Sequence, residues 1–265
     1  MPSKVSLLIP AYNREAFVAA AVGSVLRQTY HEFELLVWDD GSTDKTADVA
    51  ERAAAGDERV KLVRAAHAGL CPSINAAAKQ LTGKYFGWVD SDDAIAPNAL
   101  AETVQFLDSN PDVGMVYTDY LTMDESGRVG GLGSRTKIPY SKDRLLIDFM
   151  TFHFRLMRRH IFDRVGGVDE SIPGAEDYDL CLRLSEQSEI RKLARPLYFY
   201  RVHNKSISTE KRLWQIMQSK EAIARALKRR GMEENFEIDV ELVGRFRLRR
   251  KSKSTAENAK EGISE

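Results

Sequence analysis

The stretch "KYFGWVDSDD", residues 84–93, contains the features that decide the fold. Its first half is apolar and aromatic, as a buried strand is, and its second half places three carboxylates in four positions. A helical pattern follows from Pro97 to Leu107. A buried strand that ends in acids and leads into a helix is typical of an α/β protein with a ligand site at its strand ends.

The same alternation of strand and helix patterns extends in both directions. Four more segments are strand-like, "VSLLIP" (5–10), "FELLVWDD" (33–40), "VKLVRA" (60–65) and "VGMVYTDY" (113–120). Helix patterns lie between them, at 15–28, from about Asp44, and from about Pro72 to Gly83. This order predicts a mostly parallel, Rossmann-like sheet with helices on both faces.

The alternation fades after about residue 121. The segment 124–131 reads as a turn or hairpin, 141–167 mixes helix-like and strand-like pieces, and 176–188 is an amphipathic helix. A strand at 195–203 and a helical stretch at 209–230 follow. We expect one domain over 1–208, divided into 1–120 and a smaller region 121–208, then a helical extension 209–248 and a disordered tail 249–265.

Composition excludes several classes of protein. Among 265 residues, 39 basic and 39 acidic side chains balance, so no overall charge favours nucleic acid. Cys71 and Cys181 have neither metal-site spacing nor a disulfide framework, and we expect both to be buried in a reducing compartment. No signal peptide is visible, and the apolar stretch 16–26 is shorter than the ~20 residues that cross a bilayer. We therefore expect a cytoplasmic protein.

Acidic residues follow two strands of the predicted sheet, as Asp39–Asp40 and as Asp90, Asp92 and Asp93. The carboxyl ends of parallel strands meet at one edge, so both clusters should line the same crevice. Clustered carboxylates raise each other's pKa unless a cation or hydrogen-bond donors stabilise them. Mg²⁺ or Mn²⁺ takes one or two carboxylates and completes its shell with phosphate and water. The alternative is a set of turn and cap residues, which is what we expect for Asp44.

A nucleoside diphosphate suits this edge, with Asp40 accepting from a base N–H or a ribose hydroxyl and a metal near Asp92 holding the diphosphate. The sequence has no GxxxxGK[ST] motif, which argues against a P-loop nucleotidase or kinase. The glycine-rich "GGLGSR" (130–135) does not lie between the first strand and the first helix, so it is not a dinucleotide fingerprint.

Three motifs together resemble the family-2 inverting glycosyltransferases of the GT-A fold. They are "PAYNREAFVAAAVGSVLRQTYHEFELLVWDDGSTDKT" (10–46), "VDSDD" (89–93) and "GAEDYDLCLRL" (174–184). The resemblance is strong over residues 3–120 and moderate to about 208. It implies a nucleoside-diphosphate sugar donor, a divalent metal ion and a transfer that inverts the anomeric centre.

The resemblance also implies roles for individual residues. Nucleotide contacts fall on Pro10, Ala11, Tyr12 and Asn13, and base recognition falls on Asp40. Asp90 and Asp92 match the DxD motif, with Asp92 beside the ribose and diphosphate and Asp93 as a competing metal ligand. In "RVHNKS" (201–206), His203 matches a histidine that reaches the metal or the diphosphate. One departure is Ser73-Ile74-Asn75, where many members carry Ala-Arg-Asn, so the contact of that arginine is lost or supplied elsewhere.

Displacement at a sugar carbon needs a group that deprotonates the acceptor. Asp177 falls on the general base of the family, and with Glu176 it begins the predicted helix 176–188, where the helix dipole favours an ionised carboxylate. A simple helix cap is the alternative. The expected mechanism is a single displacement, in which Asp177 takes the acceptor proton while the metal-bound diphosphate departs. His67 and His153 are expected to have structural or surface roles.

Other readings of the sequence compete with this one. A sugar nucleotidyltransferase would need a glycine-rich, basic first loop, which "PAYNREAF" is not. A non-catalytic sugar-binding module would not need both Asp92 and Asp177. The acceptor is expected to be a carbohydrate or a lipid-linked glycan of the cell envelope. The basic segment 245–253, with six Lys or Arg in nine positions, is either a solvated tail or a peripheral contact with the inner face of the membrane.

Overall fold

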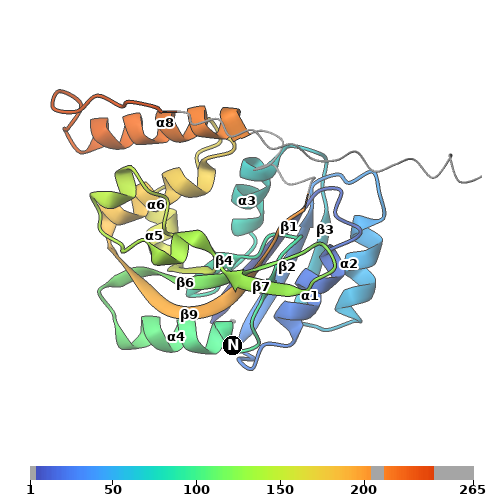
Figure 1. Cartoon of the computed structure of the whole chain (residues 1–265). Coiled ribbons are helices and arrows are strands. Elements are labelled where there is room, and N and C mark those ends of the chain that lie inside the picture. The colour runs from blue at the N-terminus through green and yellow to red at the C-terminus, as the bar shows by residue number, and fades with distance from the viewer. Residues whose placement is uncertain (1–3, 204–211, 242–265) are drawn as a thin grey trace, which may run out of the picture.

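The computed structural model describes residues 4–203 and 212–241, which form a curled mixed sheet with helices on both faces (Figure 1). The strands are β1 (Val5–Ala11), β2 (Phe33–Asp39), β3 (Val60–Arg64), β4 (Tyr85–Trp88), β5 (Ala94–Ile95), β6 (Val113–Met123), β7 (Val129–Leu132), β8 (Arg155–Arg158) and β9 (Glu189–Arg201). The helices are α1 (Val18–Leu26), α2 (Thr46–Ala54), α3 (Leu70–Ala78), α4 (Ala99–Ser109), α5 (Arg159–Arg164), α6 (Glu176–Gln187) and α8 (Arg212–Arg229), with short 3-10 turns at Ser134–Lys137 and Arg144–Leu146.

The first half of the sheet is parallel, as the sequence predicts. Its order is β3-β2-β1-β4, and Ala11 of β1 pairs with Asp39 of β2. Every residue of β1 is buried, because odd-numbered residues such as Leu7 and Ile9 face α1 and α4 while Leu8 packs on the α3 side. Burial of each such side chain contributes about 1.5–3 kcal/mol. The continuous apolar runs seen in the sequence are therefore strands covered on both faces.

The second half of the sheet is mixed rather than parallel. Strand β8 lies antiparallel between β4 and β6, so the predicted strands 84–93 and 113–120 are not neighbours. The long strand β9 then pairs in parallel with β6 and antiparallel with β5. Strand β8 escapes detection because its first and last residues, Arg155 and Arg158, are both buried. A four-residue strand with arginine at both ends has no apolar pattern to read.

Most of the smaller predictions for the second half are confirmed. The segment 124–131 is the turn and start of the β6–β7 hairpin, and the helix at 176–188 is α6. The strand expected at 195–203 is longer and begins at Glu189. Both cysteines are free and buried. Among the described residues, no helix is long and apolar enough to span a bilayer.

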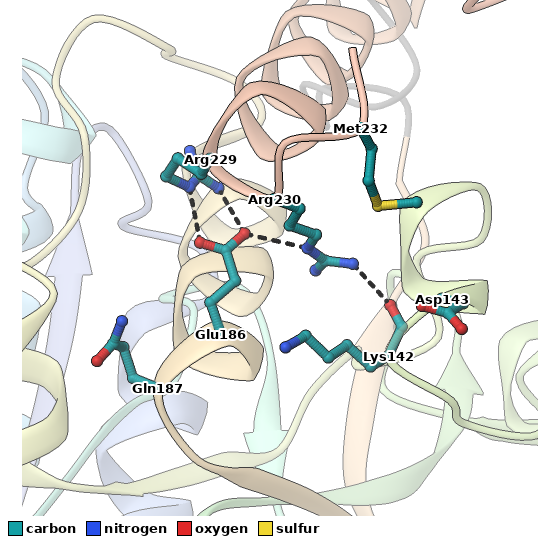
Figure 2. Close-up of a pocket in the computed structure, with 7 residues that line it drawn as sticks. All are labelled: Lys142, Asp143, Glu186, Gln187, Arg229, Arg230 and Met232. Atoms are coloured by element: carbon teal, nitrogen blue, oxygen red, sulfur yellow. Dashed lines mark hydrogen bonds and ion pairs between the residues drawn. The ribbon is translucent and has the colours of Figure 1, made fainter. Parts of the chain in front are cut away.

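Helix α8 confirms part of the predicted C-terminal extension, and it packs against α6 (Figure 1). Arg229 and Arg230 both reach Glu186, at 2.8 Å and 3.3 Å, beside a hollow of about 690 Å³ (Figure 2). The residues that line this hollow include none of the acids at the strand ends. The hollow lies between α6, the end of α8 and the loop at 142–143. Residues 209–211 and 242–248, the basic segment 245–253 and the tail 249–265 lie outside the described residues.

Candidate active site

The acids predicted at the strand ends lie along one edge of the sheet. Asp40 directly follows β2, and its N–H donates to the Ala11 carbonyl at the end of β1, at 2.9 Å. On the other side of β1, Trp88 of β4 pairs with Leu8, so Asp90 comes level with Pro10. The parallel register therefore brings the two acidic clusters to the same edge.

Asp40 is held by the main chain. It is only 4% exposed, and its Oδ1 and Oδ2 accept hydrogen bonds from the N–H groups of Ala68 and Gly69, at 2.8 Å and 2.9 Å. Gly69 immediately precedes α3, so the positive end of the helix dipole also faces this carboxylate. Asp40 therefore lies at the predicted edge, but both of its carboxylate oxygens already accept hydrogen bonds from the main chain.

An aromatic surface adjoins Asp40. The rings of Tyr12 and His67 stack with centroids 4.2 Å apart, and His67 Nδ1 lies 2.9 Å from Asp40 Oδ2. Tyr12 remains 39% exposed, so its ring is open to a ligand. His67 is thus part of this edge, and its side chain is 54% exposed, which agrees with the surface position that the sequence predicts.

The other residues of the first motif shape the edge. Asn13 has a left-handed backbone, with φ of 53°, and its side-chain oxygen accepts from the N–H of Thr43, at 2.9 Å. This bond joins the loop after β1 to the loop after β2. Pro10 and Ala11 are buried within β1 and offer little surface of their own.

Asp90 and Asp92 are paired with side-chain cations. Asp92 Oδ2 lies 3.1 Å from Arg14 Nε and 3.0 Å from His203 Nε2, and Asp90 Oδ2 lies 3.2 Å from His153 Nε2. Burial opposes ionisation of Asp90, but the charges of His153, Arg155 and Arg14 outweigh it and lower its pKa. His153, which the sequence predicts to be structural or on the surface, is buried and lies between Asp90 and Arg155.

Asp93 points into the protein. It is 1% exposed, Tyr198 Oη donates to its Oδ2 at 2.8 Å, and the Arg201 N–H donates to its Oδ1 at 2.7 Å. Burial, together with the charges of Asp92 and Asp90, raises its pKa well above the ordinary value. Of the two neighbouring acids, Asp92 is therefore the one whose side chain is partly exposed.

The last residue of β9 fixes the acidic loop. Arg201 is 6% exposed, and its Nε donates to the Asp92 carbonyl at 2.6 Å. Its Nη1 donates to the carbonyls of Asp124 and Glu125 in the β6–β7 turn, both at 3.1 Å. One guanidinium thus joins the acidic loop, the hairpin and β9.

A divalent cation fits the pair formed by Asp92 and His203. One carboxylate and one imidazole in contact are ligands that Mn²⁺ accepts, and a cation shared with substrate phosphates needs few protein ligands. Within the described residues, no group of three or more His, Cys, Asp or Glu side chains is arranged so that it could hold a metal ion by itself. The donor set thus suits a metal ion that arrives with a phosphate-bearing ligand.

The second side of the candidate site, across from the acidic loop 90–93, is the start of α6. Asp177 is 23% exposed at its side chain, and both terminal nitrogens of Arg155 lie 3.2 Å from its Oδ2. Its neighbour Glu176 is 9% exposed and accepts a hydrogen bond from the Gly174 N–H. Burial, helped by the charges of Asp177 and Asp90, raises the pKa of Glu176 to about 7.

The departure at 73–75 has a structural explanation. Ile74, where many members carry arginine, is fully buried in the core. Asn75 makes two hydrogen bonds with the main chain of Val168, each at 3.0 Å, and so anchors the loop before α6.

The sequence analysis missed three arginines of the site, Arg14, Arg155 and Arg201. Arg14, inside the "PAYNRE" motif, and Arg201, the first residue of "RVHNKS", had a signal that could have found them, and Arg155 had none.

Solved structures share this fold. S. aureus TarS (residues 1–349) in complex with UDP superposes with a TM-score of 0.67 at 23% identity, covering 84% of this chain and 65% of that one. The mannosyltransferase PcManGT from Pyrobaculum calidifontis, in complex with GDP-Man and Mn²⁺, gives 0.68 at 19% identity, covering 86% and 65%. The fold is therefore the GT-A fold.

Residues 6–166 match the family described as "Glycosyl transferase family 2", and the chain belongs to this family. It is 31% identical over 207 residues to the chondroitin synthase of Escherichia coli, and the aligned region covers 78% of this chain and 30% of that protein. It is 30% identical over 207 residues to the hyaluronan synthase of Pasteurella multocida, with 78% and 21% covered. The O-antigen biosynthesis protein RfbC of Myxococcus xanthus is 32% identical over 202 residues, with 74% and 16% covered. The match thus spans less than a third of the length of these relatives.

Proposed function

We propose that the chain is a metal-dependent, inverting glycosyltransferase that moves a sugar from a nucleoside-diphosphate sugar to a hydroxyl acceptor. One observation carries the proposal. A carboxylate–imidazole pair, Asp92 with His203, lies in the same acidic loop as Asp90, and the His153–Arg155 pair links Asp90 to a separate, partly exposed carboxylate, Asp177. Inverting transfer needs such a division, since the leaving diphosphate and the base act on opposite faces of the sugar.

The nucleotide binds, in this proposal, at the edge formed by β1 and β2. The open ring of Tyr12 stacks on the base, and Asn13 shapes the loop beside it. Each oxygen of the Asp40 carboxylate has two lone pairs, so a base N–H fits beside the main-chain donors. Pro10 and Ala11 form the floor, and Asp90 borders the ribose side.

The proposed metal ion, Mn²⁺ or Mg²⁺, is held by Asp92 and His203, and Asp93 takes no part. When bound, it offsets the negative charge of the departing diphosphate. Arg14, 3.1 Å from Asp92, adds a positive charge next to the same oxygens. Asp177 takes the proton of the acceptor hydroxyl, whose oxygen attacks the anomeric carbon from the side opposite the nucleotide.

The relatives support the choice of substrates. TarS has been crystallised with UDP-GlcNAc, and PcManGT with GDP-Man and Mn²⁺. The chondroitin and hyaluronan synthases and the O-antigen protein are named for polysaccharides. We therefore propose a role in the synthesis of a polysaccharide, glycolipid or other cell-envelope glycan, with a carbohydrate or lipid-linked acceptor.

The domain limits and location stay part of the proposal. Residues 1–208 would form the transferase domain, with 1–120 binding the donor and 121–208 the acceptor, followed by the extension 209–248 and the tail 249–265. Two free, buried cysteines support a cytoplasmic location. Attraction of segment 245–253 to the inner face of the membrane is a separate proposal that rests on its charge alone.

The test is donor turnover with and without Mn²⁺. Nucleoside diphosphates are first screened by thermal shift with Mn²⁺, and hydrolysis of the matching nucleotide-sugars is then measured. Asp177→Asn should lower metal-dependent turnover by ~10²–10⁴-fold, the usual contribution of general base catalysis. Asp163→Asn, at an exposed carboxylate paired with Arg159 on α5, is the matched control. Metal-independent turnover, or full activity of Asp177→Asn, would contradict the proposal.

A further inference from the structure

A row of four ionisable groups connects the two walls of the site. Asp90 Oδ2 lies 3.2 Å from His153 Nε2, and the His153 ring nitrogens lie 3.1 Å and 3.3 Å from Arg155 Nη2. Arg155 in turn reaches Asp177 Oδ2 with both terminal nitrogens, each at 3.2 Å. The carboxylate on the donor side and the carboxylate on the acceptor side are therefore joined through two cationic side chains.

Arg155 is almost completely buried against aromatic rings. It is 2% exposed, and its guanidinium lies 5.0 Å from the centre of the Trp88 ring and 5.8 Å from that of Phe149. Its Nε is buried without a hydrogen-bond partner among the described residues. Burying an ion pair is often no better for stability than well-packed apolar side chains of the same size. The need to fold therefore does not explain an arginine at this position.

The direction of the contacts indicates what Arg155 does. Both nitrogens converge on Oδ2 of Asp177, while Oδ1 accepts no hydrogen bond within the part of the chain that the structure describes. The side chain of Asp177 is 23% exposed. One oxygen of Asp177 is therefore held by Arg155, and the other has no hydrogen-bond partner among the described residues.

We propose that Arg155 is the positioning residue of the acceptor base: it holds Asp177 by Oδ2 so that Oδ1 alone meets the acceptor hydroxyl. This inference rests on the proposed function. Through His153, the same guanidinium sets the distance between the base and Asp90, and hence between acceptor and donor. Fixing a reacting group in this way removes orientations that cannot react.

Arg155 also acts on the charge of the base. Burial tends to lower the pKa of the guanidinium, but the charges of Asp177, Cys181 and Asp90 outweigh it, so this pKa is raised and the group stays protonated. A fixed positive charge beside a carboxylate favours the ionised form of that carboxylate. The other ionisable groups around Asp177 are His153, Asp90, Glu176 and Cys181. Loss of Arg155 should thus misplace the base and remove the positive charge beside it.

The experiment compares two buried arginines of β8. Arg155→Met should lower kcat by ~10–10³-fold with donor KM changed less than ~3-fold, and move the acid limb of the kcat profile up by ~1 pH unit or more. Arg158→Met is the matched control, because Arg158 donates to the carbonyls of Val113, Leu107 and Asn110 and to no carboxylate. It should lower the melting temperature and leave the acid limb in place.

Two further variants separate position from charge. Arg155→Lys keeps the charge without the planar fork, so kcat should fall while the acid limb stays near that of wild type. Since Glu176 titrates near pH 7, the Arg155→Met shift is measured again in a Glu176→Gln background, where it must persist. If Arg155→Met fails to fold, chemical rescue tests the inference instead. Guanidinium chloride is added at non-denaturing concentration to Arg155→Ala and to Arg155→Lys, and activity is measured. Guanidinium should restore activity only to the alanine variant.

The outcomes distinguish this inference from the proposed function. Full activity of Asp177→Asn overturns the assignment of the base and with it the role of Arg155. Loss of activity in Asp177→Asn, together with wild-type kcat and pH profile in Arg155→Met, overturns the inference alone. An acid limb that moves equally in Arg155→Met and Arg158→Met also overturns it, since the effect would then come from loosened packing of β8.

Discussion

The acids that follow β2 and the acids that follow β4 occupy equivalent places in the sheet but have different partners. Asp40 is bonded by the main-chain N–H groups of Ala68 and Gly69. Asp92 and Asp90 are instead paired with the side chains of Arg14, His203 and His153. Main-chain donors cannot leave without unfolding a loop, whereas the partly exposed side chain of Arg14 can rotate away. The first acid is thus built into the fold, and Asp92 has one partner that a ligand can replace.

The largest effect is expected from Asp92→Asn. Loss of this charge should lower metal-dependent transfer by ~10²–10³-fold, as loss of one strong electrostatic contact in an active site does. The free energy of unfolding should change by less than about 1 kcal/mol, because Asp92 and Arg14 are both partly exposed and the amide that replaces the carboxylate can still hydrogen-bond to the buried His203. Initial rates across a Mn²⁺ titration and urea unfolding test this. A large loss of stability would erase the contrast with Asp40.

Asp40→Asn should show the opposite balance. The amide offers one acceptor oxygen where the carboxylate offers two, so an N–H group near the start of α3 is left unsatisfied. The expected loss is about 1–3 kcal/mol of unfolding free energy, measured by urea denaturation. Asp48→Asn, at an exposed carboxylate paired with Arg64, is the control and should stay within about 0.5 kcal/mol. A variant as stable as wild type would show that these main-chain bonds contribute little.

Glu176 extends the comparison to an acid without a cationic partner. Its pKa is raised to about 7 from an ordinary value of 4.5, chiefly by burial, so its protonated form is favoured in the folded state. Its contribution to stability is full below pH 4.5 and disappears as the pH rises through about 7. Wild type should lose about 1–2 kcal/mol relative to Glu176→Gln between pH 5 and pH 8. Urea unfolding curves of equal pH dependence for the two proteins would contradict this.

His67→Ala should give the smallest effect. The imidazole is half-exposed, so unfolding free energy should change by less than about 0.5 kcal/mol. Donor KM should rise ~2–10-fold, because Tyr12 loses its stacked neighbour and is less well oriented for a base. Steady-state kinetics at varied donor concentration test this, with His31→Ala in the loop before β2 as control. An unchanged KM would place His67 outside the donor site.

The sequence is most informative where structure is local. Apolar runs and helix signals between residues 5 and 120 predict β1 to β4 and the helices between them, because each element follows from its own residues. Strand β8 could not be predicted, since Arg155 and Arg158 read as surface residues and their burial depends on partners elsewhere. The same limit explains why the sequence predicts a mostly parallel sheet and the structure is mixed in its second half.

The candidate site divides in the same way. The acids could be found because they occupy strand ends, a position that periodicity reveals. The family resemblance also pointed to His203, 111 residues from Asp92, whereas Arg155, 22 residues from Asp177, could not be found because it lies in a strand without an apolar pattern. Whether Asp92 or Asp93 faces outward depends on Tyr198 and Arg201 of β9, which select Asp93 for the interior. Such pairings follow from topology and not from local pattern.

The contact between Arg201 and the acidic loop has a consequence for biosynthesis. Arg201 follows Asp92 by 109 residues, yet it holds the Asp92 carbonyl and the turn at Asp124. A nascent chain emerges from the ribosome with its N-terminus first, so the parallel strands can assemble well before β9 is made. Until then the acidic loop lacks its anchor. A partly synthesised chain therefore has the parallel strands but an unfinished acidic loop, and activity should appear only when β9 has left the ribosome.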